Sequence, residues 1–428
     1  MAQIKIGIVG LGTIGSGVLQ LLRQNATKIK SVNGIEFVVK TVVVHHLNKE
    51  RGIDLNGVHL TDNIDDLLDD PEISVVVELM GGVHVAGRYI QQALESGKHV
   101  VTANKDLIAT RGNELSQIAA AHGCDLFYEA SVAGGVPILR TIVNSFGADK
   151  ITAVKGIVNG TTNYILTQMN ANGMSYQQAL KQAQKLGFAE SDPTNDVEGL
   201  DAAYKMIILT QFAFGTGVRL SDMEVQGIST LQGADVKEAR RLGYVIKLIG
   251  MSREINGHIA VSVGPVLVPL ANPLAAVSNE NNAVLVTGEA VGETMFYGPG
   301  AGKSPTANSV VSDLIAVGKD IVMGTTGLRF NAFERDLPLA AKLEDVSRYF
   351  LTFQIVDQPG EMLKLTQVMA KHDASFRMLT QTELDHGFAR VTMITHEMSR
   401  LVLESIKHEL HGVDGIRLLT DYRVLKEG

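Results

Sequence analysis

The first 130 residues place the strongest constraint on the fold. Runs of apolar, mostly β-branched residues predict strands at 4–10, 37–44, 73–79, 99–103 and 124–130. Amphipathic stretches between them predict helices at 18–29, 88–96 and 114–122. Strands that are apolar on both faces and are joined by helices form parallel sheets with helices on both sides. We therefore predict an α/β fold with a doubly wound, Rossmann-type domain over residues 1–130.

A glycine-rich turn joins the first predicted strand to the first predicted helix. The segment GIVGLGTIGSG follows the G-x-G-x-x-G pattern of dinucleotide-binding proteins. In that pattern the first glycine permits a tight turn, the second lets a pyrophosphate approach the backbone, and the third lets helix and strand pack closely. The alternative is a turn whose glycines are purely structural. The residues expected to bind the dinucleotide are Gly10, Leu11, Gly12, Thr13, Ile14 and Gly15.

The end of the second predicted strand indicates which dinucleotide binds. An acidic residue there holds the ribose 2′-hydroxyl of NAD, whereas a cation accommodates the 2′-phosphate of NADP. The segment VVVHHLNKER has no acid before Glu50, while His45, His46, Lys49 and Arg51 make a basic setting if the loop folds back. We expect NADP, with NAD possible. A basic, solvated loop without a role in selection is the alternative.

The rest of the chain predicts further domains. A length of 428 residues suits two or three of them. Residues 131–320 mix strands and helices and predict a mixed α+β substrate-binding and dimerisation domain, whose last helix, 306–320, is a candidate for returning to the first domain. Residues 321–345 have weak periodicity and are predicted to be a linker. Residues 346–428 restart with a βαββαβ order, which is typical of a small ferredoxin-like module.

Composition excludes several classes of function. The net charge of -8 argues against nucleic-acid binding, because an acidic protein does not neutralise phosphates in bulk. The single cysteine, Cys124, rules out an internal disulfide and suits a reducing cytoplasm. The uncharged stretch 261–278 contains three prolines and is therefore interpreted as strands and turns, not as a membrane helix. Because the sequence begins directly with a predicted strand, without a signal peptide, we expect a cytoplasmic protein.

The segment GFAESDPTNDVEGLDAAYK (187–205) places acids directly before an apolar helix. Asp201 and Lys205 lie at i and i+4, on one face of that helix, so the carboxylate can tune a partly buried ammonium as a proton donor. An ordinary surface pair is the alternative. The acids Glu190, Asp192 and Asp196 need a cation, either a metal, a lysine or a substrate ammonium. The spacing of a calcium loop is lacking, and solvated loop acids remain an alternative.

A second lysine follows another strand of the dinucleotide fold. In HVVTANKDLI, Lys105 comes just after the predicted strand 99–103. Ligands of open α/β sheets bind beyond the carboxyl ends of strands, so Lys105 is expected to reach the nicotinamide region. The alternative is that Asn104 and Asp106 simply cap the next helix.

These motifs together resemble one family over about 310 residues. GLGTIG, ELMGG, VTANK, YEASVAGGVP, GIVNGTTNYIL, GFAESDPTNDVEGLDAAYK and FYGPGAG with PTA occur in the order typical of monofunctional homoserine dehydrogenases with a C-terminal ACT domain. The resemblance implies reversible NAD(P)-dependent reduction of L-aspartate 4-semialdehyde to L-homoserine, in threonine, methionine and isoleucine biosynthesis. It also implies a homodimer or homotetramer.

The resemblance assigns roles to particular residues. It implies that Lys205, as proton donor and acceptor, is catalytic together with Lys105 and Asp201. It implies a substrate site at Glu190, Asp196, Gly160, Thr161 and Lys105, and further cofactor contacts at Ala103, Lys105, Gly300 and Gly302. The YEASVAGGVP turn is similar to the family's structural sodium site, with Glu129, Val132, Gly134 and Val136 as ligands. ELMGGVHVAG lacks a proline common in relatives, and His45-His46 replaces an arginine, so both departures affect the cofactor side.

The C-terminal segment DQPGEMLKLTQVMAKHDASFRM resembles the opening of an ACT domain, which binds amino acids. The implied effector is L-threonine, although ASF stands where the family usually has ISI. An ACT domain that serves only assembly is the alternative. Two rival functions for the whole chain fit the residues less well. Aspartate-semialdehyde dehydrogenase needs a reactive cysteine, which Cys124 does not resemble, and a non-catalytic sensor leaves the lysines and acids unexplained.

Overall fold

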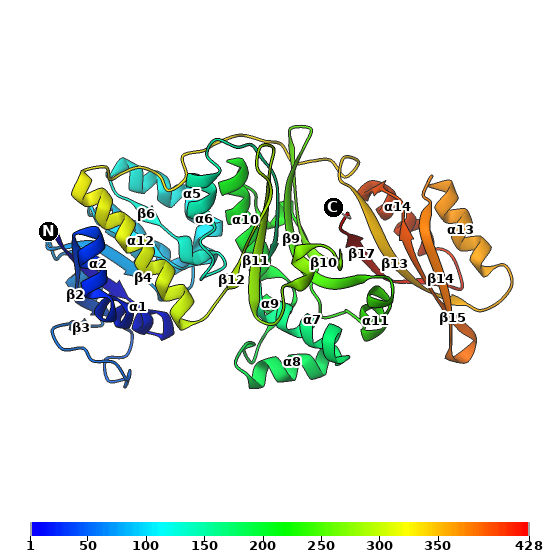
Figure 1. Ribbon diagram of the computed structural model, residues 1–428, viewed down its shortest axis with the longest axis horizontal. Coiled ribbons are helices and arrows are strands. Elements are labelled where there is room, and N and C mark those ends of the chain that lie inside the picture. Colours follow the sequence, from blue (N-terminus) through cyan, green and yellow to red (C-terminus); the bar gives the residue numbers. More distant parts are fainter. Residues whose placement is uncertain (1, 427–428) are drawn as a thin grey trace. The chain divides into compact units, whose positions relative to one another are not determined.

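The computed structural model describes residues 2–426, which divide into two compact units (Figure 1). Unit 1 holds the chain up to Ile151 together with residues 204–220 and 282–336. Unit 2 holds residues 152–203, 221–281 and the chain from Leu337 onward. Each unit is thus assembled from several separate stretches. One passage between them falls inside a helix, α10 (Leu200–Phe214), between Ala203 and Tyr204.

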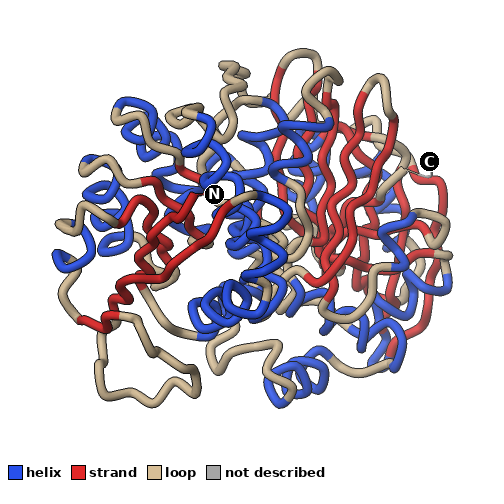
Figure 2. Tube along the Cα trace, turned by 60° about the vertical axis from the view of Figure 1, so that its left-hand side comes forward, coloured by secondary structure: helices blue, strands red, loops and turns tan. Residues whose placement is uncertain are grey.

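A six-stranded parallel sheet forms the centre of unit 1 (Figure 2). Its strands are β1 (Ala2–Val9), β2 (Ile35–Val43), β3 (His59–Thr61), β4 (Ile73–Glu78), β5 (His99–Thr102) and β6 (Leu126–Phe127). They lie in the order β3-β2-β1-β4-β5-β6, and every neighbouring pair is parallel. This order confirms the predicted doubly wound sheet. The strand predicted at 124–130 is shorter, because the chain enters a 3-10 turn, η1 (Glu129–Ser131).

Helices and a β-hairpin complete unit 1. The helices are α1 (Thr13–Gln24), α2 (Ala26–Asn33), α3 (Asp65–Leu68), α4 (His84–Glu95), α5 (Lys105–Ala121), α6 (Leu139–Ser145) and α12 (Lys303–Met323), and the hairpin is β11 (Asn281–Gly288) with β12 (Gly292–Pro299). Helix α12 packs on the parallel sheet at Gly318, where an added Cβ would lie 3.0 Å from Phe37 and 3.1 Å from Ile4. Within residues 2–426, no helix is both long and apolar enough to cross a membrane.

The first part of unit 2 surrounds a long antiparallel hairpin. Strands β9 (Tyr244–Ile255) and β10 (His258–Pro269) pair along their whole length. Strand β7 (Ile151–Ile157) pairs with β9, and the short β8 (Glu224–Val225) pairs with β10. The helices are α7 (Gly160–Asn172), α8 (Tyr176–Lys185), α9 (Thr194–Val197) and α11 (Gly233–Arg241), with 3-10 turns η2 (Leu220–Asp222) and η3 (Pro273–Ala276).

The C-terminal part of unit 2, residues 346–426, is called the C-terminal module below. Its elements are β13 (Val346–Val356), α13 (Glu361–Lys371), β14 (Phe376–Leu384), η4 (Asp385–Gly387), β15 (Phe388–Thr395), β16 (Met398–Ser399), α14 (Arg400–Leu410) and β17 (Ile416–Val424). The main strands lie in the order β17-β13-β15-β14. Apolar residues of α13 and α14, including Leu365 and Leu403, form a buried core with Leu351 and Phe353 on one sheet face.

The opposite face of this sheet contacts α11. Thr352 alternates with the core residues of β13, so its side chain points away from α13 and α14. There the hydroxyls of Thr352 and Thr420 donate to a carboxylate oxygen of the fully buried Asp235 on α11, over 3.2 and 3.5 Å, and Arg390 pairs with the same oxygen. Burial raises the pKa of Asp235, with Arg390 opposing. The C-terminal module is therefore joined to the rest of unit 2 through polar as well as strand contacts.

Candidate active site

The glycine loop of unit 1 leaves an open space before α1. Gly10 has a φ of 98°, and an added Cβ would lie 2.8 Å from the carbonyl carbon of Leu79. An added Cβ at Gly15 would lie 2.2 Å from the carbonyl oxygen of Gly10, so only glycine allows α1 to pack against the loop. A Cβ at Gly12 would meet nothing within 4 Å, and no side chain caps the N-terminus of α1. The space and the exposed N–H groups suit a pyrophosphate.

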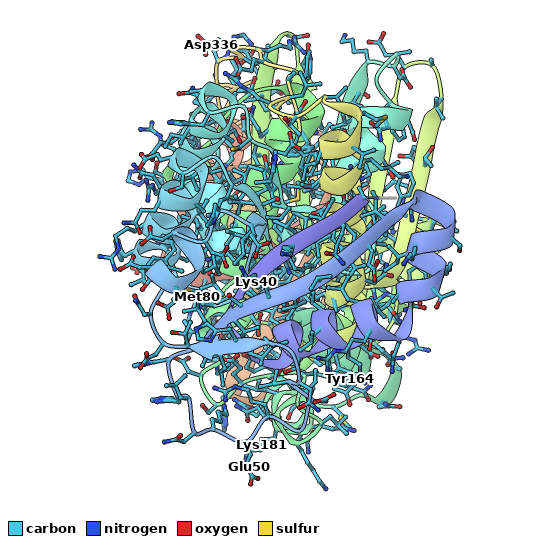
Figure 3. All side chains as sticks on the ribbon, turned by 90° about the vertical axis from the view of Figure 1, so that its left-hand side faces the viewer. Lys40, Glu50, Met80, Tyr164, Lys181 and Asp336 are labelled. Carbon is cyan, nitrogen blue, oxygen red and sulfur yellow. The ribbon has the colours of Figure 1, made fainter. Side chains whose placement is uncertain are left out.

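A buried acid connects the carboxyl ends of β4 and β5. Glu78 is 1% exposed, and its carboxylate accepts from the backbone N–H groups of Met80 and Gly81 and from the hydroxyl of Thr102, over 2.8, 3.1 and 2.7 Å. Met80 itself is exposed beyond the end of β4 (Figure 3). Glu78 was not predicted as a site residue, although its position as an acid at the end of an apolar strand was an available signal. Glu78 shapes the loop beside the β1–β4 switch point, where doubly wound sheets bind ligands.

Lys105 is the first residue of α5, directly after Ala103 and Asn104 at the end of β5. Asn104 caps the helix by accepting from the N–H of Leu107, and its amide donates to the carbonyl of Gly82 over 2.6 Å. The Lys105 ammonium lies 3.5 Å from a carboxylate oxygen of Asp106, and its side chain is 30% exposed. The capping alternative therefore holds for Asn104, while Lys105 still stands at the carboxyl edge of the sheet.

The loop after β2 folds back on itself through Arg51. The Arg51 guanidinium donates to the backbone carbonyls of His46, Leu47 and Lys49. The rings of His45 and His46 stack, with centroids 4.5 Å apart. Glu50, the first acid after the strand, is exposed (Figure 3). The end of β2 thus has basic side chains where NAD-selective sites have an acid.

The GPGAG loop packs against the YEASVAGGVP turn. The N–H of Gly135 donates to the carbonyl of Pro299, and an added Cβ at Gly134 would lie 2.7 Å from the carbonyl oxygen of Gly300. Gly302 has a φ of 115° and precedes α12. The next residue, Lys303, donates to Gln20 on α1 over 3.0 Å, so this loop lies close to the helix that follows the glycine loop.

Glu129 belongs to a buried polar network. Its carboxylate accepts from the N–H groups of Leu139 and Arg140 at the start of α6, over 2.9 and 2.8 Å, and its own N–H donates to Asp313. Burial raises the pKa of Glu129 and raises that of Asp313 to about 7, with the Arg140 guanidinium opposing both shifts. Val132 is buried in the same turn, the N–H of Val136 donates to the carbonyl of Ala133, and Ser309 donates to the carbonyl of Gly134.

In unit 2, Asn159 joins two of the predicted acids. Its side-chain amide donates to Asp196 over 2.6 Å and to Asp201 over 2.7 Å. Its side-chain oxygen accepts from the N–H of Thr162 over 2.8 Å, so Asn159 also caps α7. Gly160 and Thr161 were predicted as site residues, but the neighbouring Asn159 was not. An asparagine directly before a predicted helix was the available signal.

The loop that carries Glu190 lies against the start of α7. The Thr161 hydroxyl donates to the carbonyl of Phe188 over 2.6 Å, and an added Cβ at Gly160 would lie 2.6 Å from the carbonyl oxygen of Glu280. Glu190 is exposed, two residues beyond Phe188. Asp192 instead accepts from the hydroxyl and N–H of Thr194, which lowers its pKa. Gly160, Thr161, Asp196 and Asp201 are thus gathered around Asn159, whereas Asp192 only stabilises its own loop.

Helix α10 carries both Asp201 and Lys205. Asp201 is 8% exposed, and Lys205 is half-buried one turn later. The far end of the helix is fixed in unit 1, where the ring of Phe212 packs edge-on against Tyr128 and Phe330. Among residues 2–426, no three His, Cys, Asp or Glu side chains gather as a metal site.

Cys124 is free and buried, and burial raises its pKa to about 11. A cysteine that forms a thioester must instead ionise near neutral pH. Cys124 therefore lacks the character of the nucleophile that the thiol-dependent rival reaction needs.

Comparison with known proteins assigns the family. Residues 10–129 match the NAD-binding domain of homoserine dehydrogenase, and residues 137–315 match homoserine dehydrogenase. A homoserine dehydrogenase of Bacillus subtilis is 44% identical over 431 residues, covering 100% of both chains. The crystal structure of one from Thiobacillus denitrificans has a TM-score of 0.94 at 37% identity, covering 99% of each chain. A hyperthermophilic archaeal homoserine dehydrogenase in complex with NADPH has a TM-score of 0.63 at 25% identity, covering 74% of this chain and 98% of its own. The chain therefore belongs to the homoserine dehydrogenase family of NAD(P)-binding oxidoreductases, which act on a CH–OH group.

Proposed function

We propose that the chain catalyses the reversible reduction of L-aspartate 4-semialdehyde to L-homoserine, a step shared by threonine, methionine and isoleucine biosynthesis. One observation carries the assignment of its residues: the buried amide of Asn159 holds Asp196 and Asp201 together, one helical turn before Lys205. Two carboxylates that share one amide donor suit the ammonium of an amino-acid substrate. Glu190, on the adjoining loop, is proposed to add a third carboxylate.

The proposed chemistry follows from this spacing. When bound, the nicotinamide exchanges a hydride with the substrate carbon. The acids bind the substrate ammonium, and Gly160 and Thr161 belong to the loop beside the ammonium. Lys205, on the same helix as Asp201, gives a proton to the carbonyl oxygen in reduction and takes it back in oxidation. Lys105, at the edge of the cofactor-binding sheet, stabilises the developing alkoxide.

We propose NADP as the preferred cofactor. The residues present fit a dinucleotide, because Gly12 leaves open space at an uncapped helix N-terminus. Gly10 to Gly15, Ala103, Gly300 and Gly302 would line it. NADP is favoured over NAD by the absence of an acid at the end of β2, by the folded-back Arg51, and by the NADPH bound to the archaeal relative.

We also propose a structural sodium ion at Glu129, Val132, Gly134 and Val136. One carboxylate with backbone carbonyls is a suitable donor set for a hard cation. The Glu129 oxygens and the Gly134 carbonyl already accept hydrogen bonds, yet each keeps a second lone pair for an ion. The ion would stabilise the turn that packs on the GPGAG loop.

The C-terminal module is proposed to be an ACT domain through which L-threonine inhibits the enzyme. Its βαββαβ order and DQPGEM turn support this. ACT modules commonly act in pairs, so we propose a homodimer or homotetramer.

A spectrophotometric assay with L-homoserine and either cofactor tests the main proposal. We expect homoserine-dependent reduction of both cofactors, with a higher kcat/KM for NADP. If neither cofactor is reduced, the catalytic assignment is rejected and the non-catalytic sensor becomes the favoured function. A higher kcat/KM for NAD would reject only the proposed preference.

A further inference from the structure

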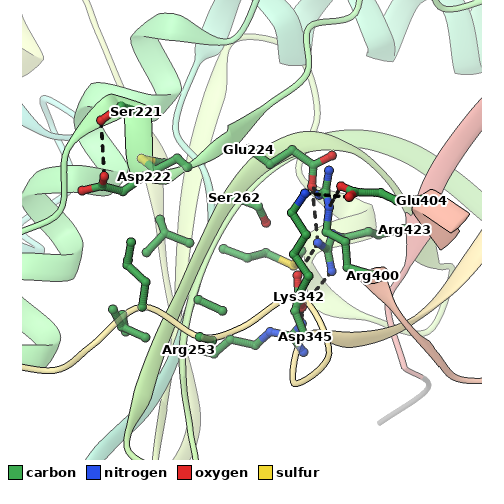
Figure 4. A pocket seen from close by; sticks show the side chains of 17 residues that line it. Ser221, Asp222, Glu224, Arg253, Ser262, Lys342, Asp345, Arg400, Glu404 and Arg423 are labelled. Carbon is green, nitrogen blue, oxygen red and sulfur yellow. Dashed lines mark hydrogen bonds and ion pairs between the residues drawn. The ribbon is translucent and has the colours of Figure 1, made fainter. Parts of the chain in front are cut away.

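Lys247 differs from the other buried cations of unit 2. It lies on β9 and is 3% exposed, whereas lysine is almost never buried so completely unless it is paired. Arg423, a buried cation on β17, pairs with the Asp345 carboxylate over 2.6 Å (Figure 4). No charged neighbour among residues 2–426 contributes to the pKa of Lys247, which burial alone lowers to about 8. Burial of an ammonium without an ion pair is unfavourable, so its hydrogen bonds must compensate.

The Lys247 ammonium donates two hydrogen bonds. One goes to the side-chain oxygen of Asn163 over 3.1 Å, and the other goes to the carbonyl of Val277. The Asn163 amide in turn donates to the carbonyls of Val277 and Asn281, over 3.3 and 3.1 Å. Lys247 and Asn163 together thus hold both ends of the segment 277–281, and these four residues are called the lysine clamp below.

The segment 277–281 packs against α7. The N–H of Asn279 donates to the hydroxyl of Thr167 over 3.0 Å, and Asn279 has a φ of 59°, in the left-handed region that asparagine tolerates. The carbonyl oxygen of Glu280 lies 2.6 Å from the position that a Cβ would take at Gly160. The segment held by the lysine clamp therefore lies directly against the first residue of α7.

The first turn of α7 connects the lysine clamp to two of the acids. Asn163 belongs to this turn, and its N–H donates to the carbonyl of Asn159 over 3.2 Å. The side-chain amide of Asn159 donates to Asp196 and Asp201. Because the internal geometry of a helical turn is fixed, a displacement of Asn163 also displaces Asn159. The lysine clamp is therefore one hydrogen-bonded turn away from the donor that both carboxylates share.

We infer that Lys247 is a positioning residue for recognition of the substrate ammonium. The inference rests on the function proposed above, in which Asp196 and Asp201 bind that ammonium. Lys247 acts through Asn163 and the segment 277–281, and thereby sets the place from which Asn159 donates to the two acids. Since the proposed proton transfer belongs to Lys205, loss of the Lys247 ammonium weakens substrate binding and leaves the rate of turnover unchanged.

Lys247→Met in the full chain tests the inference, because methionine keeps most of the apolar stem and removes the ammonium. We expect the KM for L-homoserine to rise about tenfold, as for the loss of one charge-assisted hydrogen bond, with kcat and the Kd of NADPH within about twofold of wild type. Steady-state kinetics at saturating cofactor and fluorescence titration of NADPH measure the three constants. A wild-type KM in this variant, or a fall in kcat without a rise in KM, would overturn the inference.

A double-mutant cycle with Asn159→Ser tests the path through α7. If Lys247 acts through Asn159, the rise in KM of the double variant should be at least about threefold smaller than the product of the two single rises. Two rises that simply multiply would show independent action and would also reject the inference. If Lys247→Met does not fold, Asn163→Ala takes its place in the kinetics and in the cycle, because it removes the side-chain oxygen to which the ammonium donates.

Lys98→Met is the matched control. Lys98 of unit 1 is 5% exposed, donates to the carbonyls of Asp70 and Ile73 over 2.7 and 2.9 Å, and has a pKa that burial lowers. This variant should lose thermal stability and keep the wild-type KM, whereas an equal rise in its KM would mean that KM reports stability alone. If the wild-type chain does not oxidise homoserine, the proposed function fails and the inference fails with it. A wild-type KM in Lys247→Met rejects the inference only.

Discussion

The glycine loop and the acids around Asn159 recognise their proposed ligands in opposite ways. The glycine loop offers backbone N–H groups and empty space, and it works because Gly12 has no side chain. The acids offer carboxylate side chains, two of which accept hydrogen bonds from one buried amide. A backbone site depends on local conformation, whereas a side-chain site depends on partners distant in sequence. The two regions should therefore respond differently to substitution.

The largest effect is expected for Lys205→Ala. Loss of the proton donor should lower kcat by about 10²–10⁴-fold, with little change in the Kd of NADP. Lys205→Arg should stay slow, because a guanidinium holds its proton too tightly to transfer it. Steady-state kinetics and fluorescence titration of NADPH would measure both quantities. Lys181→Ala, an exposed lysine of α8, is the control, and near-normal turnover in Lys205→Ala would remove this residue from the mechanism.

A smaller effect, on substrate binding, is expected for Asn159→Ala. Without the amide, Asp196 and Asp201 lose the hydrogen-bond donor that they share, so the KM for homoserine should rise about 10–100-fold. The helix cap is lost as well, at about 1 kcal/mol of stability. Asn159→Ser restores a cap but not the bridge between the acids, so thermal unfolding should recover while KM stays high. Recovery of KM in the serine variant would mean that Asn159 acts only as a cap.

The smallest effects are expected for alanine substitutions at two glycines of the loop, and these two variants should differ in stability. Gly12→Ala fills space that no protein atom occupies, so NADP affinity should fall by roughly tenfold with an unchanged Tm. Gly15→Ala forces α1 away from Gly10, so affinity should fall and the free energy of unfolding should drop by about 1–3 kcal/mol. Binding titration and calorimetric scanning would measure the two properties. An unchanged affinity in Gly12→Ala would show that no phosphate occupies this space.

Much of unit 1 could be predicted from sequence, because its signals are local. Apolar runs marked the parallel strands, and the glycine spacing marked the turn between β1 and α1. Strand β3 was not predicted because it has only three residues. The strand predicted at 124–130 was too long because Glu129 turns toward α6. Helical spacing puts Asp201 and Lys205 on one face, and the resemblance singled them out as a catalytic pair. Their catalytic roles remain predictions.

The features that sequence analysis missed depend on long-range contacts. Asn159 contacts Asp201 across 42 positions, and Glu78 contacts Thr102 across 24. The Arg423 guanidinium donates to Glu224 across 199 positions. A single sequence shows that each of these residues is polar, but the partner that gives it a role appears only when the chain is folded. The division into units also cuts across chain order, which composition and periodicity do not report.

The continuity of α10 limits which sequence changes this part of the chain can accept during evolution. Four residues of helix fix the rise between Asp201 and Lys205 at about 6 Å, and their angular offset at about 40°. Insertion or deletion of a single residue here would turn the lysine about 100° away from the carboxylate. Surface loops elsewhere tolerate changes in length, but this stretch admits only exchanges of one residue for another.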